Sequence, residues 1–171
     1  MADVKILGRT DEGAIVIKDL FEFLREIEQQ FGKTINKEIR KVSYDVTRLL
    51  EKEVRAEAAS VYTGRRAEQA KGLASGLRAK NDRIPTIQLR YTETFRSRSR
   101  PNSKRRTPVL KGDVFRGSEF GGGRRKTTRQ FLRHRGQVGY FFWPTVRKNR
   151  ENIAKLYLQG IDQVVKTFGF K

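Results

Sequence analysis

The chain has 171 residues, 36 % of them hydrophobic and 33 % charged, and 38 Lys and Arg against 19 Asp and Glu give a formal net charge of +19. This length suits one domain with a modest core, and the charge predicts a polyanionic partner: nucleic acid, an acidic protein surface or an assembly that faces nucleic acid. The lack of cysteine excludes disulfides and thiolate metal sites, and no run approaches the roughly 20 apolar residues of a membrane span, so we expect a soluble intracellular protein.

Residues 1–18 are expected to form an N-terminal arm or hairpin. Two short apolar runs, 4–7 and 14–17, flank a segment whose Asp11 and Gly13 favour a turn. Because an isolated hairpin is only marginally stable, this arm would need a neighbour to pack against.

A long helix is predicted from residue 19 to about residue 60, where apolar residues recur at spacings of mostly three and four. Nine acidic and eight basic residues make it nearly neutral, so the positive charge of the protein lies elsewhere. About 40 residues in one helix would span roughly 60 Å, against about 40 Å for a compact domain of this size. We therefore expect the helix to break at Phe31 and Gly32 or to pack on a neighbouring subunit, with a coiled coil as the alternative.

Shorter elements follow this helix. A segment rich in small residues, 65–80, predicts a second helix of weak propensity. Residues 85–91 read PTIQLRY, in which Ile87 and Leu89 alternate with polar residues, as in a half-buried strand. A further strand is expected over 109–120.

Two basic loops are predicted beside these strands. The first, 94–107, has Phe95 as its one large apolar residue and is expected to be a flexible loop or a hairpin tip. The second, 121–137, opens with three consecutive glycines, which make a continuous helix costly, so residues 119–121 are interpreted as the end of a strand that enters a loop.

The chain closes with an aromatic run and a helix. Residues 140–143 are expected to form a short strand that Pro144 ends, since proline donates no hydrogen bond to a sheet. An amphipathic helix is predicted from residue 145 to about 168, with Gly169 at its C′ position.

These elements predict an α+β fold. It has a long N-terminal helix, a short helix, a small antiparallel sheet of three to four strands and a C-terminal helix packed on that sheet. Residues 19–171 would then form a single domain.

Residue types suited to catalysis are scarce. The single histidine, His134, lies between two arginines in a chain without cysteine, so neither a Cys-His pair nor a histidine metal cluster is available. Asp113 and Glu119 are the only acids between residues 94 and 146, and they make a weak carboxylate dyad. The glycine-rich 120–126 segment lacks the GKS or GKT signature of a phosphate-binding loop. The sequence therefore predicts no catalytic residue, no metal and no cofactor.

The two basic loops are the strongest physical signal. Between residues 92 and 135, fourteen Lys or Arg stand against three acids, a net of +11 out of +19. Arginine in loops suits phosphate contact without sequence specificity, although a solvated loop or contact with an acidic protein ring is the alternative. The residues expected to face nucleic acid or a lumen are Arg96, Arg98, Arg100, Lys104, Arg105, Arg106, Arg124, Arg125 and Lys126.

The aromatic residues could stack on bases, as they do in proteins that bind single strands. On a strand, however, neighbouring rings of the 140–143 run would face opposite sides, which favours burial in the core or at a subunit interface. The residues expected there are Phe120, Gly121, Phe131, Tyr140, Phe141, Phe142, Trp143 and Pro144.

Four features, in this order, resemble one family. They are the alanines near the end of the long helix (55–60), Thr63-Gly64 with the GLASGLR segment (72–78), the Glu119-Phe120-Gly121 turn, and GYFFWPTVR (139–147) leading into the last helix. The chain from about residue 20 onward is similar to the neck proteins of long-tailed bacteriophages, the tail-completion and head-tail joining group related to tail terminators. The 1–18 arm and the long arginine-rich loop are not explained by the resemblance.

The resemblance implies a structural virion protein without enzymatic activity. Such a protein would form a homo-oligomeric ring, expected to be sixfold, between the head and the tail, with tail-tube and head-closure or adaptor proteins as partners and non-specific contact with packaged DNA. The alternative is a free nucleic-acid-binding protein, for which the charge alone would suffice; a small nuclease ranks third.

Overall fold

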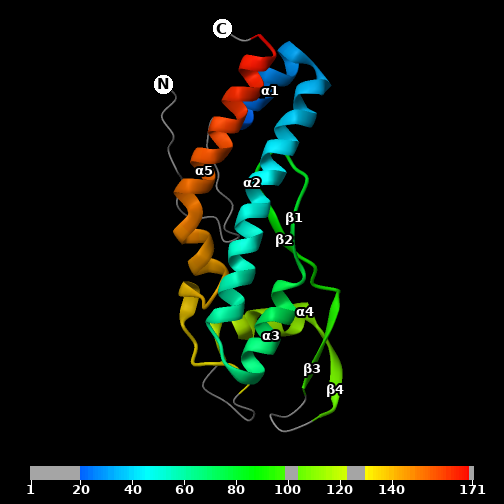
Figure 1. Ribbon diagram of the computed structural model, residues 1–171, viewed down its shortest axis with the longest axis vertical. Coiled ribbons are helices and arrows are strands. Elements are labelled where there is room, and N and C mark those ends of the chain that lie inside the picture. Colours follow the sequence, from blue (N-terminus) through cyan, green and yellow to red (C-terminus); the bar gives the residue numbers. More distant parts are fainter. Residues whose placement is uncertain (1–19, 99–103, 123–129, 170–171) are drawn as a thin grey trace. The chain divides into compact units, whose positions relative to one another are not determined.

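The computed structural model describes residues 20–98, 104–122 and 130–169 (Figure 1). The whole of the expected 1–18 arm, and Arg100, Arg124, Arg125 and Lys126, lie outside these ranges. The elements are α1 (Leu20–Phe31), α2 (Lys33–Ser60), α3 (Gly64–Ala74), β1 (Leu77–Ala79), β2 (Ile87–Leu89), β3 (Thr94–Arg98), β4 (Arg106–Leu110), α4 (Lys111–Phe120), the 3₁₀ helix η1 (Gly136–Val138) and α5 (Phe142–Thr167). The predicted α+β class is confirmed, with two sheets of two strands in the described residues instead of one larger sheet.

The predicted break in the long helix is confirmed at Gly32. This residue has φ +71°, a left-handed conformation that glycine adopts without the steric cost other residues meet, and it separates α1 from α2. Its N–H donates to the carbonyl of Glu28 at 2.9 Å, which closes the last turn of α1.

The chain divides into two compact units, and the first contains residues 20–49, 79–86 and 149–169 of the described chain. Its core is built from one apolar stripe on each helix segment, and α1 lies beside the C-terminal end of α5 (Figure 1). The Phe31 and Phe168 rings meet edge to face with centroids 6.1 Å apart. The buried core residues are Leu20, Leu24, Ile27, Ile35, Ile39, Val46, Ile153, Tyr157, Ile161 and Val165.

The second unit contains residues 50–78 and 87–148, apart from the two undescribed segments. Within it, α3 contacts β3 and α4, while α4 contacts β4 and η1. Strands β3 and β4 pair antiparallel in the register Thr94↔Leu110 to Arg98↔Arg106. Both ends of the first basic loop are therefore paired strands, and the loop or hairpin tip expected between them lies outside the described residues.

The strand predicted over 109–120 is wrong, because helix α4 begins at Lys111. Its buried residues, Lys111, Val114, Phe115, Ser118 and Glu119, follow the helical spacing i, i+3, i+4, i+7, i+8. Two glycines obscured this pattern because glycine disfavours helix. In each case an aromatic ring from another segment occupies the space beside the glycine. A Cβ at Gly117 would lie 2.4 Å from the Phe131 ring, and one at Gly112 would lie 3.1 Å from the Tyr91 ring.

The strand predicted over 140–143 is also wrong, because α5 begins at Phe142. Pro144 is therefore the third residue of a helix, not the end of a strand. Proline is tolerated in the first turn, where its missing N–H would have no partner within the helix. At the other end Gly169 has φ +86°, which fits its predicted C′ position.

The remaining predicted elements are shorter than expected. The 65–80 helix is α3, which ends at Ala74, and residues 77–79 form β1. The 85–91 strand is β2, which covers only Ile87–Leu89 and pairs with β1.

Candidate functional site

The β3–β4 hairpin has two chemically different faces. Its inner face carries Phe95 and Ser97, which are half-buried and buried, opposite Val109 and Thr107. Its outer face consists of the register pairs Thr94↔Leu110, Arg96↔Pro108 and Arg98↔Arg106. Every outer-face side chain that is described is exposed, and so are Lys104 and Arg105 before β4. For Arg98 the structure gives the backbone position only.

A glycine of α3 seats the inner face. A Cβ at Gly72 would lie 2.3 Å from the ring of Phe95, so only glycine lets this ring approach the helix so closely. Gly72 belongs to the GLASGLR segment that the sequence singled out. Its packing role explains why a helix contains a residue of low helix propensity at this point.

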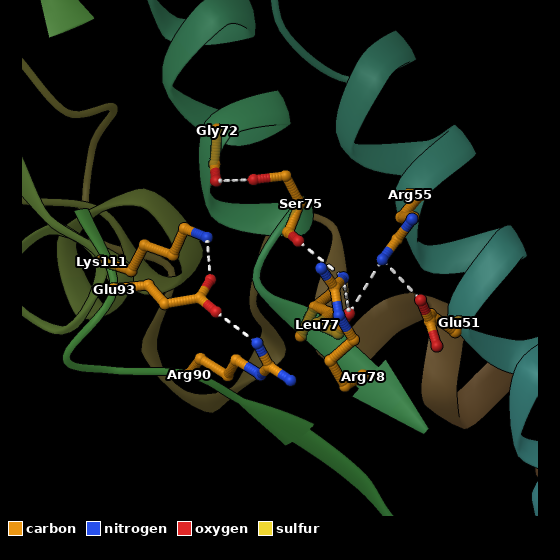
Figure 2. A network of polar contacts seen from close by, with 9 residues as sticks. All are labelled: Glu51, Arg55, Gly72, Ser75, Leu77, Arg78, Arg90, Glu93 and Lys111. Atoms are coloured by element: carbon orange, nitrogen blue, oxygen red, sulfur yellow. Dashed lines mark hydrogen bonds and ion pairs between the residues drawn. The ribbon is translucent and has the colours of Figure 1, made fainter. Parts of the chain in front are cut away.

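A buried lysine closes the base of the hairpin (Figure 2). Glu93 precedes β3 and Lys111 follows β4; the Lys111 N–H donates to the Glu93 carbonyl at 2.9 Å, and Nζ of Lys111 lies 2.6 Å from Oε2 of Glu93. The Lys111 side chain is only 4 % exposed. A Cβ at Gly76 would lie 2.5 Å from Cδ of Lys111, so the second glycine of GLASGLR makes room for this lysine.

Glu93 accepts from two cations at once. Nη1 of Arg90 lies 2.6 Å from its Oε1, while Lys111 occupies Oε2 (Figure 2). The hydrogen bonds from Lys111 and then Arg90 lower the pKa of Glu93 to about 2. Both oxygens of this carboxylate are therefore engaged at the base of the hairpin.

The α2 and α3 ends beside β1 are joined by arginine contacts to carbonyls (Figure 2). Nη2 of Arg55 donates to the Leu77 carbonyl at 2.9 Å and contacts Glu51 at 2.5 Å. Nη1 of Arg78 donates to the carbonyls of Ser75 and Leu77 at 2.7 and 2.8 Å. Fixing the turn after α3 in this way fixes the position of Gly76.

Glu119 joins two of the sequence motifs that the resemblance depended on. Its side chain leaves α4 and meets the start of α5, where Oε2 accepts from the N–H groups of Phe141 and Phe142 at 3.2 and 2.9 Å, and Oε1 accepts from that of Trp143 at 2.9 Å. The next residue, Pro144, has no N–H. The free donors of the first turn of α5 are thus all satisfied.

The environment of Glu119 is dry. The residue is 0 % exposed, and a Cβ at Gly139, which has φ +74°, would lie 2.1 Å from its Oε1. Desolvation by burial raises the pKa of this carboxyl, while the backbone N–H groups, led by that of Phe142, lower it. Asp113 lies exposed on another face of α4. Asp113 and Glu119, which the sequence analysis weighed as a carboxylate dyad, therefore do not face one site.

The predicted aromatic residues divide between core and partial burial. Phe141 is fully buried, and its ring meets that of Tyr62 with centroids 6.4 Å apart. Tyr62 also donates its hydroxyl hydrogen to the carbonyl of Ser118, and its burial raises the pKa of the phenol. The partly buried members are Phe120, Gly121, Phe131, Tyr140, Phe142, Trp143 and Pro144.

The ends of the second basic loop are paired with each other. Gly122 N–H donates to the Leu132 carbonyl at 2.8 Å and Arg135 N–H to the Phe120 carbonyl at 2.9 Å. Gly121 has φ +85°, and a Cβ there would lie 2.3 Å from the Arg133 carbonyl oxygen. The glycine run thus begins a closely paired loop base.

Other candidate chemistry in the described residues is limited. His134 is exposed, and its Nδ1 accepts from the Gly136 N–H at 3.1 Å. No group of three or more His, Cys, Asp or Glu is placed to hold a metal ion within the described ranges. A cavity of about 10 Å³, room for one water, is lined by residues that include Tyr62, Gln69 and Phe131. None of the described helices is long and apolar enough to cross a membrane.

The sequence identified the arginines of the hairpin but not the residues that hold it. Glu93 and Lys111 are far apart along the chain and follow no periodic pattern, so nothing in the sequence signalled their pairing. The two glycines of GLASGLR were visible, but their partners Phe95 and Lys111 become apparent only in three dimensions.

Comparison with models of protein families, with curated proteins and with solved structures found no match for this chain.

Proposed function

We propose that this chain is a structural subunit of the neck of a long-tailed phage particle, where it forms a ring, expected to be sixfold, that joins or terminates the tail at the head. The main support is what the motif residues do. Gly72 and Gly76 admit Phe95 and Lys111, and Glu119 caps the helix that begins at Phe142. The residues on which the resemblance to the neck family rests are thus occupied in packing and capping, as suits a structural subunit.

The hairpin supports the ring arrangement. Its inner face packs against α3, so Arg96 and Arg106 on its outer face are available to a binding partner. In a ring between head and tail these cations would face the lumen or the neighbouring ring. Subunit contacts would come from the long α2 and from the 119–144 region.

The experiment is an association assay with the full chain. Its mass in solution is measured by light scattering, first alone and then with the tail-tube and head-closure proteins of the same phage. Stable association with either partner, in a sixfold stoichiometry, is the expected result. A chain that stays monomeric and binds neither partner would overturn the proposal.

A free nucleic-acid-binding protein is the second candidate, and the exposed arginines of the hairpin are the observation that favours it. The two candidates differ in where the protein ends up. A monomer that binds DNA tightly, and that is missing from purified particles, would favour the free protein; a component of the particle at fixed copy number favours the neck.

A further inference from the structure

The outer face of the hairpin holds its arginines at a regular spacing. Arg96 and Arg98 are two residues apart on β3, and Arg106 stands opposite Arg98 on β4. At about 3.4 Å per residue, alternate positions on a strand repeat roughly every 6.8 Å. The face is therefore a short cationic ladder with a fixed repeat.

The register of the hairpin places two arginines opposite one another. Like charges directly opposite one another in an antiparallel pair are unfavourable, and the register sets Arg98 opposite Arg106. Glu68 of α3 lies 3.9 Å from Arg106. Glu93 is occupied by Lys111 and Arg90. Two like charges held opposite one another are an arrangement that a bound anion would stabilise.

The ladder is also held rigidly from behind. Phe95 is seated on Gly72, and the Lys111–Glu93 pair closes the base of the hairpin. A preorganised face loses less entropy on binding than a mobile loop would. These contacts fix a cationic surface before its partner arrives.

From this geometry we infer that the outer face of the β3–β4 hairpin binds the sugar-phosphate backbone of duplex DNA without reading its sequence. Guanidinium groups match phosphate oxygens in a two-pronged geometry, and a two-stranded ribbon is narrow enough to lie along a DNA groove. Successive phosphates of one strand rise about 3.4 Å along the helix axis and also rotate around it, so they lie on the order of 7 Å apart, close to the repeat of the ladder. The inference rests on the proposed function in that DNA passes through the ring.

The test is a salt titration of binding to a fluorescent duplex of random sequence, read by anisotropy. The variant is Arg96→Gln with Arg106→Gln, and the matched control is Lys37→Gln with Lys41→Gln, which removes the same charge from exposed positions on α2. Each lost phosphate contact lowers the slope of log K against log salt by about 0.9, so the hairpin variant should lose about 1.8. Its affinity at 0.1 M salt should fall on the order of 10- to 100-fold.

A variant of opposite sign guards against loss of folding. Glu68→Gln removes the acid beside Arg106 and should tighten DNA binding by about two- to tenfold, while Glu22→Gln, at an exposed site on α1, should change it little. Equal effects of the hairpin pair and the Lys37 and Lys41 control would overturn the inference. Displacement of DNA by poly-glutamate at equal charge concentration would also overturn it, because it would identify an acidic protein as the partner.

Failure of this inference and failure of the neck proposal give different results. If the hairpin variant still assembles with the tail-tube or head-closure protein but the wild type shows no hairpin-dependent DNA binding, the neck proposal stands and the DNA contact falls. If DNA binding depends on the hairpin but no assembly occurs, the DNA contact stands and the neck proposal falls.

Discussion

The carboxylate of Glu119 accepts a hydrogen bond from the backbone N–H of Trp143 at 2.9 Å, and this contact ties the end of α4 to the start of α5. Two further N–H groups of the same turn donate to the same carboxylate. A side chain from one helix thus takes the place of the local N-cap residue that another helix would use. The Glu-Phe-Gly turn and the aromatic run, which the sequence singled out separately, form one structural unit.

Replacing Glu119 by Gln should destabilise the protein at pH 7 by about 1–3 kcal/mol, because an amide keeps one acceptor oxygen and leaves a buried N–H without a partner. Urea unfolding followed by circular dichroism measures the change. Asp113→Gln, at an exposed position on the same helix, is the control and should stay within about 0.5 kcal/mol of wild type. An unchanged midpoint for Glu119→Gln would show that the cap contributes nothing.

The stability that Glu119 provides should depend on pH in a definite direction. Because burial raises its pKa above the ordinary 4.5, the folded state holds this proton more tightly than the unfolded state does. The difference in free energy of unfolding between wild type and Glu119→Gln should therefore be larger at pH 4.5 than at pH 7. A difference that shrinks on acidification would mean that the three N–H donors outweigh desolvation and lower the pKa.

Glu93 should behave in the opposite way. Its pKa is about 2 in the folded protein against 4.5 ordinarily, so its contribution is complete above pH 4.5 and is lost as the pH falls towards 2. The stability difference between wild type and Glu93→Gln should shrink over that window, as measured by unfolding at a series of pH values. A constant difference from pH 5 to pH 2 would contradict the Lys111–Glu93 contact.

Gly72→Ala tests how the hairpin is seated. Alanine normally stabilises a helix interior by about 0.5–1 kcal/mol relative to glycine. Here the new Cβ would meet the Phe95 ring at 2.3 Å, so we expect a loss of about 1–3 kcal/mol instead. A thermal melt measures the change, and the direction of the shift in melting temperature is sufficient. A more stable Gly72→Ala protein would mean that the hairpin does not lie against α3.

The sequence predicted the fold where spacing and glycine position carried the signal. The α2 periodicity, the break at Gly32 and the C′ position of Gly169 all depend on local conformation, and the structure confirms them. The failures came where a distant group changes the local rule. The Phe131 ring packs against Gly117 in α4, and Glu119 caps the first turn of α5. Because both contacts come from distant residues, local sequence patterns did not predict that either segment is helical.

The candidate site divides in the same way. Arg96 and Arg106 could be identified from composition because clustered arginine is visible in any window of the sequence. Their presentation on one face of a hairpin required the β3–β4 register and the seating of Phe95 on Gly72. Those are long-range contacts, which a single sequence does not display.

The most direct test of the neck proposal is a cryo-EM reconstruction of the assembled phage particle with this chain fitted into the density. A neck subunit should appear as a closed ring of this protein between the head and the tail tube, with the β3–β4 hairpins directed towards the central channel. Particles of full length whose head-tail junction contains no density for this fold would contradict it.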